Sequence, residues 1–257
     1  MPPSEWPFLD TPGVLAFAHR GAHGPDAGGL PENTMAAYEA AVGMGYRYVE
    51  TDVHRTADGV LVAFHDDGLD RVTDRIGKIA DLAWSEVREA RLVGGHGVPL
   101  FEDLLGSWPE LRVNVEPKAD ASVDLLADVI ERTGSLDRVC VGSFSGKRLT
   151  RLRTRLGPRL CTSMGPFATV QLRIASLGVP VGPITAACAQ VPVRRGPVPV
   201  VDRRFVAAAH RRGLQVHVWT VDDRAEMERL LDLGVDGLMT DRPAVLKAVL
   251  EERGLSL

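Results

Sequence analysis

Three acidic side chains that could share a cation lie at the ends of apolar runs in this sequence. Glu50 and Asp52 alternate in "YRYVETDVH", and Glu116 lies in "LRVNVEPK". Because successive strand residues face opposite sides, Glu50 and Asp52 share one face of their strand. Crowded carboxylates repel one another unless a cation lies among them. Oxygen ligands without a cysteine suit Ca²⁺, Mg²⁺ or Mn²⁺ better than Zn²⁺; the alternative is a set of carboxylate–Lys/Arg pairs that holds no metal.

Cationic and imidazole side chains accompany these carboxylates. Arg20 follows the run "VLAFAH", and Lys118 shares a strand face with Glu116. Cations beside a metal imply an anionic ligand, and phosphate fits the fork of an arginine. His19 ends the first run, and His65 closes a short hairpin that should return it beside the second strand. Two histidines that face one anion suit a general acid and a general base near neutral pH.

The other histidines and the cysteines are interpreted as structural or surface residues. His217 lies in an alternating run and is expected to be a buried, hydrogen-bonded barrel residue. The cysteines are odd in number, widely spaced and each in an apolar run, which favours buried free thiols over disulfides or metal ligands. They are Cys140, Cys161 and Cys188, and the histidines expected in loops or on the surface are His23, His54, His96 and His210.

Strand-like and helix-like runs alternate along the chain and would position these residues. Eight strand–helix units can be counted, from "VLAFAH" to "VDGLMTD". Such alternation is typical of a parallel sheet with helices outside it. Eight units favour an α/β fold of the closed (β/α)8 TIM-barrel type over an open doubly wound sheet. Because reactive groups of such barrels lie at the carboxyl ends of the strands, we expect the residues above to meet at one mouth.

One run does not fit the repeat and indicates a small insertion after the second strand. The run "VLVAFHD" follows "YVETDVH" after five residues that include the turn signal Asp58-Gly59. This gap is too short for a helical crossover, so the two runs should pair as an antiparallel hairpin. We therefore predict an insertion at about residues 53–99 within a single barrel domain of residues 1–257. The proline-rich "VPVRRGPVPVV" is interpreted as a long loop after the sixth strand.

Composition and charge argue against several classes of protein. The 257 residues carry a formal net charge of −4, which argues against a broad nucleic-acid-binding surface. No apolar run approaches the roughly 20 residues of a membrane-spanning helix, so no stable membrane anchor is expected. The opening "MPPSEWPFLDTPG" lacks the basic and apolar regions of a secretory signal. With the unpaired thiols, these features predict a cytoplasmic location.

The motifs, taken in order, resemble those of the glycerophosphodiester phosphodiesterase family. The ordered set is HRG, PENT, E-x-D, HD and E-x-K, and the similarity continues through "VPLFEDLL", "GSF", "VHVWTV" and "VDGLMTDRP". It covers nearly the whole chain. The resemblance implies a metal-dependent barrel hydrolase that cleaves a glycerophosphodiester to sn-glycerol 3-phosphate and an alcohol. The divalent cation would be Ca²⁺ or Mg²⁺, with Mn²⁺ a further candidate.

The resemblance also implies roles for individual side chains. Trp219 would line the pocket beside the glycerol part, and Phe144 is either a second pocket residue or part of the barrel core. Whether water or the glycerol 2-hydroxyl attacks stays open, as does which histidine acts first. The remaining assignments are the catalytic pair His19 and His65, the metal ligands Glu50, Asp52 and Glu116, and the phosphate-binding cations Arg20 and Lys118.

Two features depart from the family pattern. The loop of residues 22–30 is longer than the usual link between HRG and PENT, and Pro117 replaces an aliphatic residue and would stiffen the site. Gly21 is expected to leave room for the backbone beside the ligand. Asn33 or Thr34 should cap the first helix.

Two alternative functions remain beside the phosphodiesterase. One is a phospholipase D-like activity on lysophospholipids, and the other is a non-catalytic phosphate-binding barrel. The sequence predicts neither the leaving alcohol nor the oligomeric state.

Overall fold

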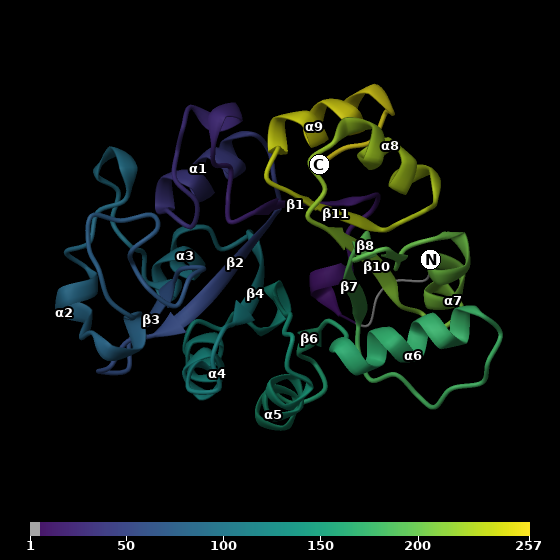
Figure 1. The fold of residues 1–257 in the computed structure, drawn as a ribbon, viewed down its shortest axis with the longest axis horizontal. Helices are drawn as coiled ribbons and strands as arrows, with labels where there is room; N and C mark the ends of the chain where they lie inside the picture. The colour runs from purple at the N-terminus through teal and green to yellow at the C-terminus, as the bar shows by residue number, and fades with distance from the viewer. Residues whose placement is uncertain (1–5) are drawn as a thin grey trace.

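Within residues 6–257, which the computed structural model describes, eight parallel strands form a nearly closed barrel (Figure 1). A bridge between Ser163 and Cys188 joins β6 to β7 and completes the ring. The (β/α)8 barrel predicted from the alternation is confirmed. In ring order the strands are β6 (Cys161–Thr162), β5 (Val139–Val141), β4 (Arg112–Pro117), β2 (Tyr48–Arg55), β1 (Leu15–His19), β11 (Gly237–Thr240), β10 (Gln215–Trp219) and β7 (Cys188–Pro192).

Helices alternate with these strands and cover the outside of the ring (Figure 1). The main apolar core lies between the two layers and includes the outward-facing valines Val49, Val113 and Val216. Because valines alternate with polar residues along these strands, the polar side chains face the inside of the barrel. The helices are α1 (Met35–Gly43), α3 (Phe101–Ser107), α4 (Ser122–Arg132), α5 (Gly146–Leu156), α6 (Pro166–Ser176), α7 (Arg203–His210), α8 (Arg224–Asp232) and α9 (Pro243–Glu252).

A short 3-10 helix before the first strand, η1 (Pro7–Leu9), closes the end of the barrel where the strands begin. The Tyr48 hydroxyl donates to the Phe8 carbonyl at 2.8 Å, and Gln215 Nε2 donates to the Leu9 carbonyl at 3.2 Å. Phe8 is fully buried, and its ring centroid lies 5.3 Å from that of Tyr48. The segment that precedes β1 is therefore part of the barrel core.

The inner layer of the barrel contains the predicted structural residues. His217 is fully buried, and its Nε2 lies 3.1 Å from Gln215 Oε1, which confirms the interpretation as a hydrogen-bonded core residue. The cysteines of the described chain are buried free thiols that belong to one apolar cluster, as predicted: Cys140, Cys161 and Cys188.

The insertion after β2 begins with the expected hairpin. Strand β3 (Leu61–Ala63) pairs antiparallel with β2, with Val53 opposite Ala63. The segment continues through η3 (Ile79–Asp81), α2 (Trp84–Val87) and η4 (Val93–Gly95). It buries an apolar cluster of its own, and the assignment of the chain to one domain stays a prediction. The buried members are Val62, Phe64, Leu69, Ile79, Val87, Ala90, Leu92 and Val98.

The structure corrects two local predictions. The stretch "VPVRRGPVPVV" is not an irregular loop throughout, because β8 (Arg194–Arg195) and β9 (Val198–Pro199) form a small antiparallel hairpin. Gly196, at a φ of +60°, allows its tight turn. His54 was expected in a loop or on the surface, but it is buried, with only 4% of its surface exposed. Strand β2 runs on to Arg55, and the insertion covers this part of it.

The turn after β1 has a packing reason for its glycine. Gly21 has a φ of +82°, and a Cβ there would lie 2.8 Å from the Ala37 carbonyl carbon of α1. The close approach of α1 therefore requires glycine at this position, and the expected room for a ligand beside it stays a prediction. Thr34 is the cap of α1, since its Oγ1 accepts the amide hydrogen of Ala37 at 3.2 Å.

Candidate active site

The carboxyl ends of β1, β2 and β4 bring the predicted acidic residues to one mouth of the barrel. The strand register places His19 beside Glu50, and Asp52 beside Glu116. Glu50 and Asp52 are buried, with 6% and 2% exposure. The geometry expected from the E-x-D spacing and from barrel topology is therefore present.

Lys118 occupies the space between two of the carboxylates. Its Nζ lies 2.7 Å from Asp52 Oδ1 and 3.0 Å from Glu116 Oε2. Although burial opposes a charged ammonium, these carboxylates raise the pKa of Lys118 above its ordinary value. Among residues 6–257, no group of three or more His, Cys, Asp or Glu side chains is arranged to hold a metal ion. In this arrangement two carboxylates converge on an ammonium.

The donor atoms nevertheless suit a hard cation. Burial, together with the charge of Asp52, raises the pKa of Glu50 to about 7. The positive charges of the neighbouring Arg20 and Lys118 therefore compensate the buried carboxylates only in part. Asp52 Oδ2 is buried and accepts no hydrogen bond from any residue that the structure describes. Such an oxygen is costly to bury unless a cation meets it. Because Ca²⁺ and Mg²⁺ prefer carboxylate oxygens, Glu50, Asp52 and Glu116 fit the implied ion.

Arg20 lies at the turn that follows β1, with its guanidinium directed to the carboxylates. Its Nη1 donates to Glu32 Oε1 at 3.0 Å, and its Nε lies 3.7 Å from Asp52 Oδ2. That Nε is buried and donates no hydrogen bond within residues 6–257. Arg20 also adopts a φ of +57°, which L-residues rarely take. A free, buried donor on a guanidinium suits an anionic oxygen of a ligand.

His19 is held by a carboxylate that the sequence analysis missed. Its Nδ1 lies 2.6 Å from Asp241 Oδ1, and its Nε2 lies 3.6 Å from Glu50 Oε2. Although burial opposes the imidazolium, Glu50 and Asp241 raise the pKa of His19. Although burial also opposes the carboxylate, hydrogen bonds from His19 and His23 hold the pKa of Asp241 well below its usual range. The available signal was position, because Asp241 directly follows β11 at the mouth.

His23 is a second residue whose place was not foreseen. It was expected to be a loop or surface residue, and it does lie in the loop of residues 22–30. Its side chain is only 16% exposed, and its Nε2 lies 3.1 Å from the same Asp241 oxygen that contacts His19. The loop of residues 22–30 therefore places an imidazole beside the candidate active site.

The hairpin returns His65 to the end of β2, as its sequence position predicted. The Phe64 amide donates to the Asp52 carbonyl at 2.9 Å, so His65 directly follows a residue that is bonded to the backbone of Asp52. His65 Nδ1 lies 2.6 Å from Asp66 Oδ1. The side chain of His65 is 32% exposed, which leaves the imidazole accessible from the mouth.

Two aromatic side chains stand together on the opposite part of the mouth. The ring centroids of Phe144 and Trp219 lie 5.7 Å apart in an edge-to-face arrangement. The Phe144 amide also donates to Glu116 Oε1 at 3.4 Å. Phe144 is 67% exposed, so the alternative that placed it in the barrel core is wrong. The pair forms an apolar wall next to the third carboxylate.

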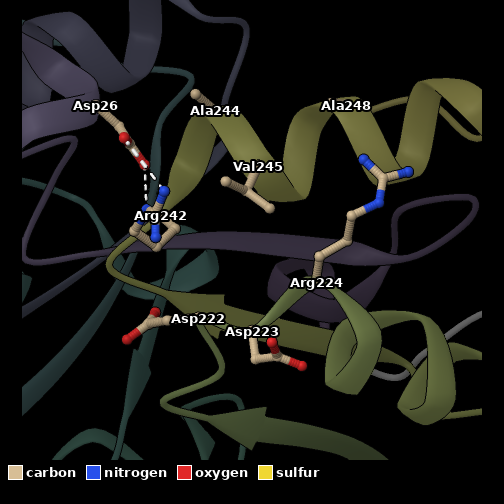
Figure 2. Close-up of a pocket in the computed structure, with 8 residues that line it drawn as sticks. All are labelled: Asp26, Asp222, Asp223, Arg224, Arg242, Ala244, Val245 and Ala248. Atoms are coloured by element: carbon tan, nitrogen blue, oxygen red, sulfur yellow. Dashed lines mark hydrogen bonds and ion pairs between the residues drawn. The ribbon is translucent and has the colours of Figure 1, made fainter.

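A separate depression lies at the rim, where α8 and α9 begin (Figure 2). Asp26 and Arg242 form an ion pair there, which ties the loop of residues 22–30 to the segment before α9. The residues predicted for the active site are not among those that line this depression. The lining residues are Asp26, Asp222, Asp223, Arg224, Arg242, Ala244, Val245 and Ala248.

Comparison with known proteins agrees with this architecture. The model of the glycerophosphoryl diester phosphodiesterase family matches residues 19–245. The chain belongs to this family. A relative from Mycobacterium tuberculosis, "Probable glycerophosphodiester phosphodiesterase 2", is 40% identical over 255 residues, covering 96% of this chain and 94% of the relative.

Solved structures of glycerophosphodiester phosphodiesterases share the fold. The enzyme from Agrobacterium tumefaciens has a TM-score of 0.74 at 25% identity, with 92% of this chain and 98% of that chain covered. A phosphodiesterase from Oleispira antarctica, solved with the product sn-glycerol-3-phosphate, has a TM-score of 0.76 at 22% identity, with 92% and 96% covered. The latter likeness shows the fold alone.

Membership in the glycerophosphoryl diester phosphodiesterase family confirms that the chain is an enzyme of this class. The matched region begins at His19, so η1 and most of β1 lie before it. Within residues 6–257, no helix has the length and apolar character needed to cross a membrane.

Proposed function

We propose that this enzyme hydrolyses glycerophosphodiesters to sn-glycerol 3-phosphate and an alcohol by metal-dependent acid–base catalysis with His19 and His65. One observation carries the proposal. Each of the two imidazoles meets a carboxylate through Nδ1, at 2.6 Å in both cases. A bond at Nδ1 fixes the ring and leaves Nε2 as the reactive nitrogen.

The proposed steps require only the transfer of protons by these two residues. One Nε2 removes a proton from the attacking hydroxyl or water as the new P–O bond forms. The other gives a proton to the leaving alkoxide oxygen as the old P–O bond breaks. If the glycerol 2-hydroxyl attacks, this step forms a cyclic phosphate, and a water must then attack it: one imidazole removes the proton of the water and the other protonates the departing 2-oxygen, which yields glycerol 3-phosphate. Arg20 would hold the phosphate oxygens, since its buried Nε has no protein acceptor among the described residues. The geometry supports either order of the two histidines.

Glu50, Asp52 and Glu116 would hold the divalent cation, for which we propose Ca²⁺ or Mg²⁺, with Mn²⁺ as a further candidate. A bound cation supplies charge stabilisation to the phosphoryl oxygens. Lys118 would then lose its contact with Asp52, or share that carboxylate with the cation. Its ammonium would remain available to the phosphate. The raised pKa of Glu50 supports this assignment, because a divalent cation would restore its carboxylate form.

Trp219 and Phe144 would contact the glycerol part of the substrate. Their edge-to-face pair offers carbon and ring-edge surface beside Glu116, where the ester would lie. We also propose a cytoplasmic location, since the cysteines of the described chain are free and buried. The substrate is a small molecule, and the leaving alcohol is to be found by assay.

The test is a panel of diesters assayed after the enzyme is stripped of metal. Glycerophosphocholine, glycerophosphoethanolamine and a lysophospholipid would each be supplied with Ca²⁺, Mg²⁺ or Mn²⁺. Release of the head-group alcohol is the common readout, and the second product is glycerol 3-phosphate from the diesters or lysophosphatidic acid from the lysophospholipid. We expect metal-dependent turnover of the water-soluble diesters, and its loss in His19→Ala and His65→Ala. Full activity in chelator, or in both variants, would contradict the mechanism. Faster turnover of the lysophospholipid would favour the phospholipase D-like alternative.

A further inference from the structure

One arginine of the insertion lies between two carboxylates of the mouth. Arg71 Nε donates to Asp66 Oδ2 at 2.5 Å, and its Nη2 donates to Asp66 Oδ1 at 3.1 Å. The same Nη2 donates to Glu32 Oε1 at 2.6 Å. Glu32 belongs to the PENT segment before α1, whereas Asp66 follows His65. A single guanidinium thus joins segments that are far apart in the sequence.

Each of these carboxylates in turn holds a group of the proposed mechanism. Glu32 Oε1 accepts from Arg20 Nη1 at 3.0 Å, and Asp66 Oδ1 lies 2.6 Å from His65 Nδ1. A continuous chain of contacts therefore runs from Arg20 through Glu32, Arg71 and Asp66 to His65. It connects the group that would bind the phosphate with one of the groups that would transfer a proton.

We propose that Arg71 is a positioning residue that fixes the guanidinium of Arg20 and the imidazole of His65 in position relative to each other. The inference rests on the proposed function, because it assigns a purpose to contacts with the proposed phosphate-binding and acid–base residues. The planar guanidinium of an arginine can bind one carboxylate through two of its nitrogens and a second carboxylate at the same time. The ammonium of a lysine cannot hold two carboxylates in such a fixed geometry.

The charges along the chain support this role. The hydrogen bonds from Arg71 are the main reason that the pKa of Asp66 is lowered to about 2, so Asp66 stays an acceptor for His65. Glu32 is only 14% exposed, and Arg71 and Arg20 lower its pKa although burial opposes its charge. Arg71 itself is half exposed, at 49%, so it can be replaced without opening the core.

The test compares Arg71→Met, Glu32→Gln and Asp66→Asn, with Arg75→Met as the matched control. Arg75 lies in the same insertion, and its side chain forms no ion pair within residues 6–257. Steady-state kinetics on glycerophosphocholine would give kcat and KM, and calorimetry would give the affinity for sn-glycerol 3-phosphate. Thermal unfolding of every variant would show that it is folded; Arg71→Lys replaces Arg71→Met if the latter is not.

The expected pattern separates positioning from a general structural role. Asp66→Asn should lower kcat and leave the affinity for glycerol 3-phosphate unchanged, since it acts through His65. Glu32→Gln should weaken that affinity, since it acts through Arg20. Arg71→Met should do both and lower kcat/KM by about 10–100-fold, the usual cost of losing an orienting partner. In the Asp66→Asn background, the effect of Arg71→Met on kcat should be largely lost. Arg71→Lys should give a kcat/KM between those of Arg71→Met and the unmodified enzyme. Arg75→Met should match the unmodified enzyme.

Two results would overturn the inference. One is an Arg71→Met enzyme with unchanged kcat/KM alongside an inactive His65→Ala enzyme. The other is an effect of Arg71→Met on kcat that is equally large with and without Asp66→Asn. A failure of the proposed function looks different, because the unmodified enzyme would then show no turnover, or His65→Ala would be fully active.

Discussion

Lys118 Nζ lies 2.7 Å from Asp52 Oδ1, among the carboxylates that we propose as metal ligands. Asp52 is almost fully buried, so this ammonium is the direct partner of a charge that water cannot reach. A divalent cation bound by the same carboxylate would perform the same neutralisation. The ammonium and a cation should therefore compete for one place, and this competition can be measured.

Replacement of Lys118 by methionine should make the protein depend on a divalent cation for its stability. Removal of one partner of a buried pair typically costs about 3–5 kcal/mol, and the partial exposure of Lys118 places the expected loss near the lower end. We expect Ca²⁺, Mg²⁺ or Mn²⁺ to raise the melting temperature more in Lys118→Met than in the unmodified protein, both measured against chelator. Lys147→Met, at an exposed lysine, is the control. Equal shifts in all three proteins would contradict the prediction.

The contribution of Glu50 to the stability of the metal-free protein should fall as the pH rises from about 4.5 to about 7. Glu50 has an ordinary pKa of 4.5 and a folded pKa of about 7, because it is buried beside Asp52. Within this window the folded state holds a proton that the unfolded state has lost, so linkage gives a loss of up to about 1.4 kcal/mol per pH unit. The raised pKa of His19 acts in the same direction, since its contribution is lost as the pH rises through the folded pKa.

Urea unfolding in chelator across this pH window measures the slope. Glu50→Gln should flatten it, because the variant has no proton to lose at this position, and saturating divalent cation should flatten it in the unmodified protein. A slope that is as steep in Glu50→Gln as in the unmodified protein would assign the effect to other groups.

Replacement of Asp241 by asparagine should lower kcat by about 100-fold, with KM little changed, since the carboxylate orients His19 without contacting the substrate. The amide can no longer accept a charge-assisted hydrogen bond from Nδ1, and the ring can adopt the wrong tautomer. His23→Gln is the matched control, because it removes the second contact with the same Asp241 oxygen and leaves His19 in place. A full kcat in Asp241→Asn would remove His19 from the proposed acid–base pair.

Replacement of Phe144 by alanine should raise KM for glycerophosphodiesters about tenfold and leave kcat unchanged, because one side of the apolar wall beside Trp219 is lost. Phe144 is 67% exposed, so the melting temperature should not change. Phe167→Ala is the control, since Phe167 is 79% exposed on α6 and belongs to no part of the proposed site. An unchanged KM in Phe144→Ala would place the glycerol part elsewhere.

The ion pair between Asp26 and Arg242 should control the mobility of the loop of residues 22–30 and, with it, the preference among leaving alcohols. Either Asp26→Lys or Arg242→Glu should increase amide hydrogen exchange in the loop and change the ratio of kcat/KM between glycerophosphocholine and glycerophosphoethanolamine. The charge-swapped double variant should restore both. Faster exchange without any change in that ratio would show that the loop does not contact the leaving group.

Much of this molecule follows from residue patterns that repeat locally. Strands β2, β4 and β10 alternate valines with polar residues, so their inner and outer faces could be assigned before the structure. The hairpin after β2 followed from the short gap and its turn residues, and the meeting of Glu50, Asp52 and Glu116 followed from the topology of a barrel. These features depend on neighbours in the chain or on one global rule of the fold.

The features that were missed depend on contacts between distant residues. Asp241 contacts His19 across 222 positions, and nothing near Asp241 in the sequence indicates that partner. The spacing E-x-K placed Lys118 beside Glu116, but its contact with Asp52 depends on the register of β2 and β4. His54 ends the strand-like run "YRYVETDVH" and was expected in a loop or on the surface, because nothing in the sequence showed that the insertion covers it.

The 3-10 helix η1, which closes the end of the barrel where the strands begin, has a practical consequence for the design of shortened versions of this chain. The family similarity begins at His19, where β1 ends, whereas Phe8, Leu15 and Phe17 are buried before that point. A fragment cut at the start of the similarity would lack the floor of the barrel and nearly all of its first strand. Strands β2 and β11 would then face each other across an open seam with unpaired edges, and such edges recruit other chains. A fragment of this kind should be recovered as aggregate, whereas in residues 6–257 the strands of one chain pair with each other around the ring.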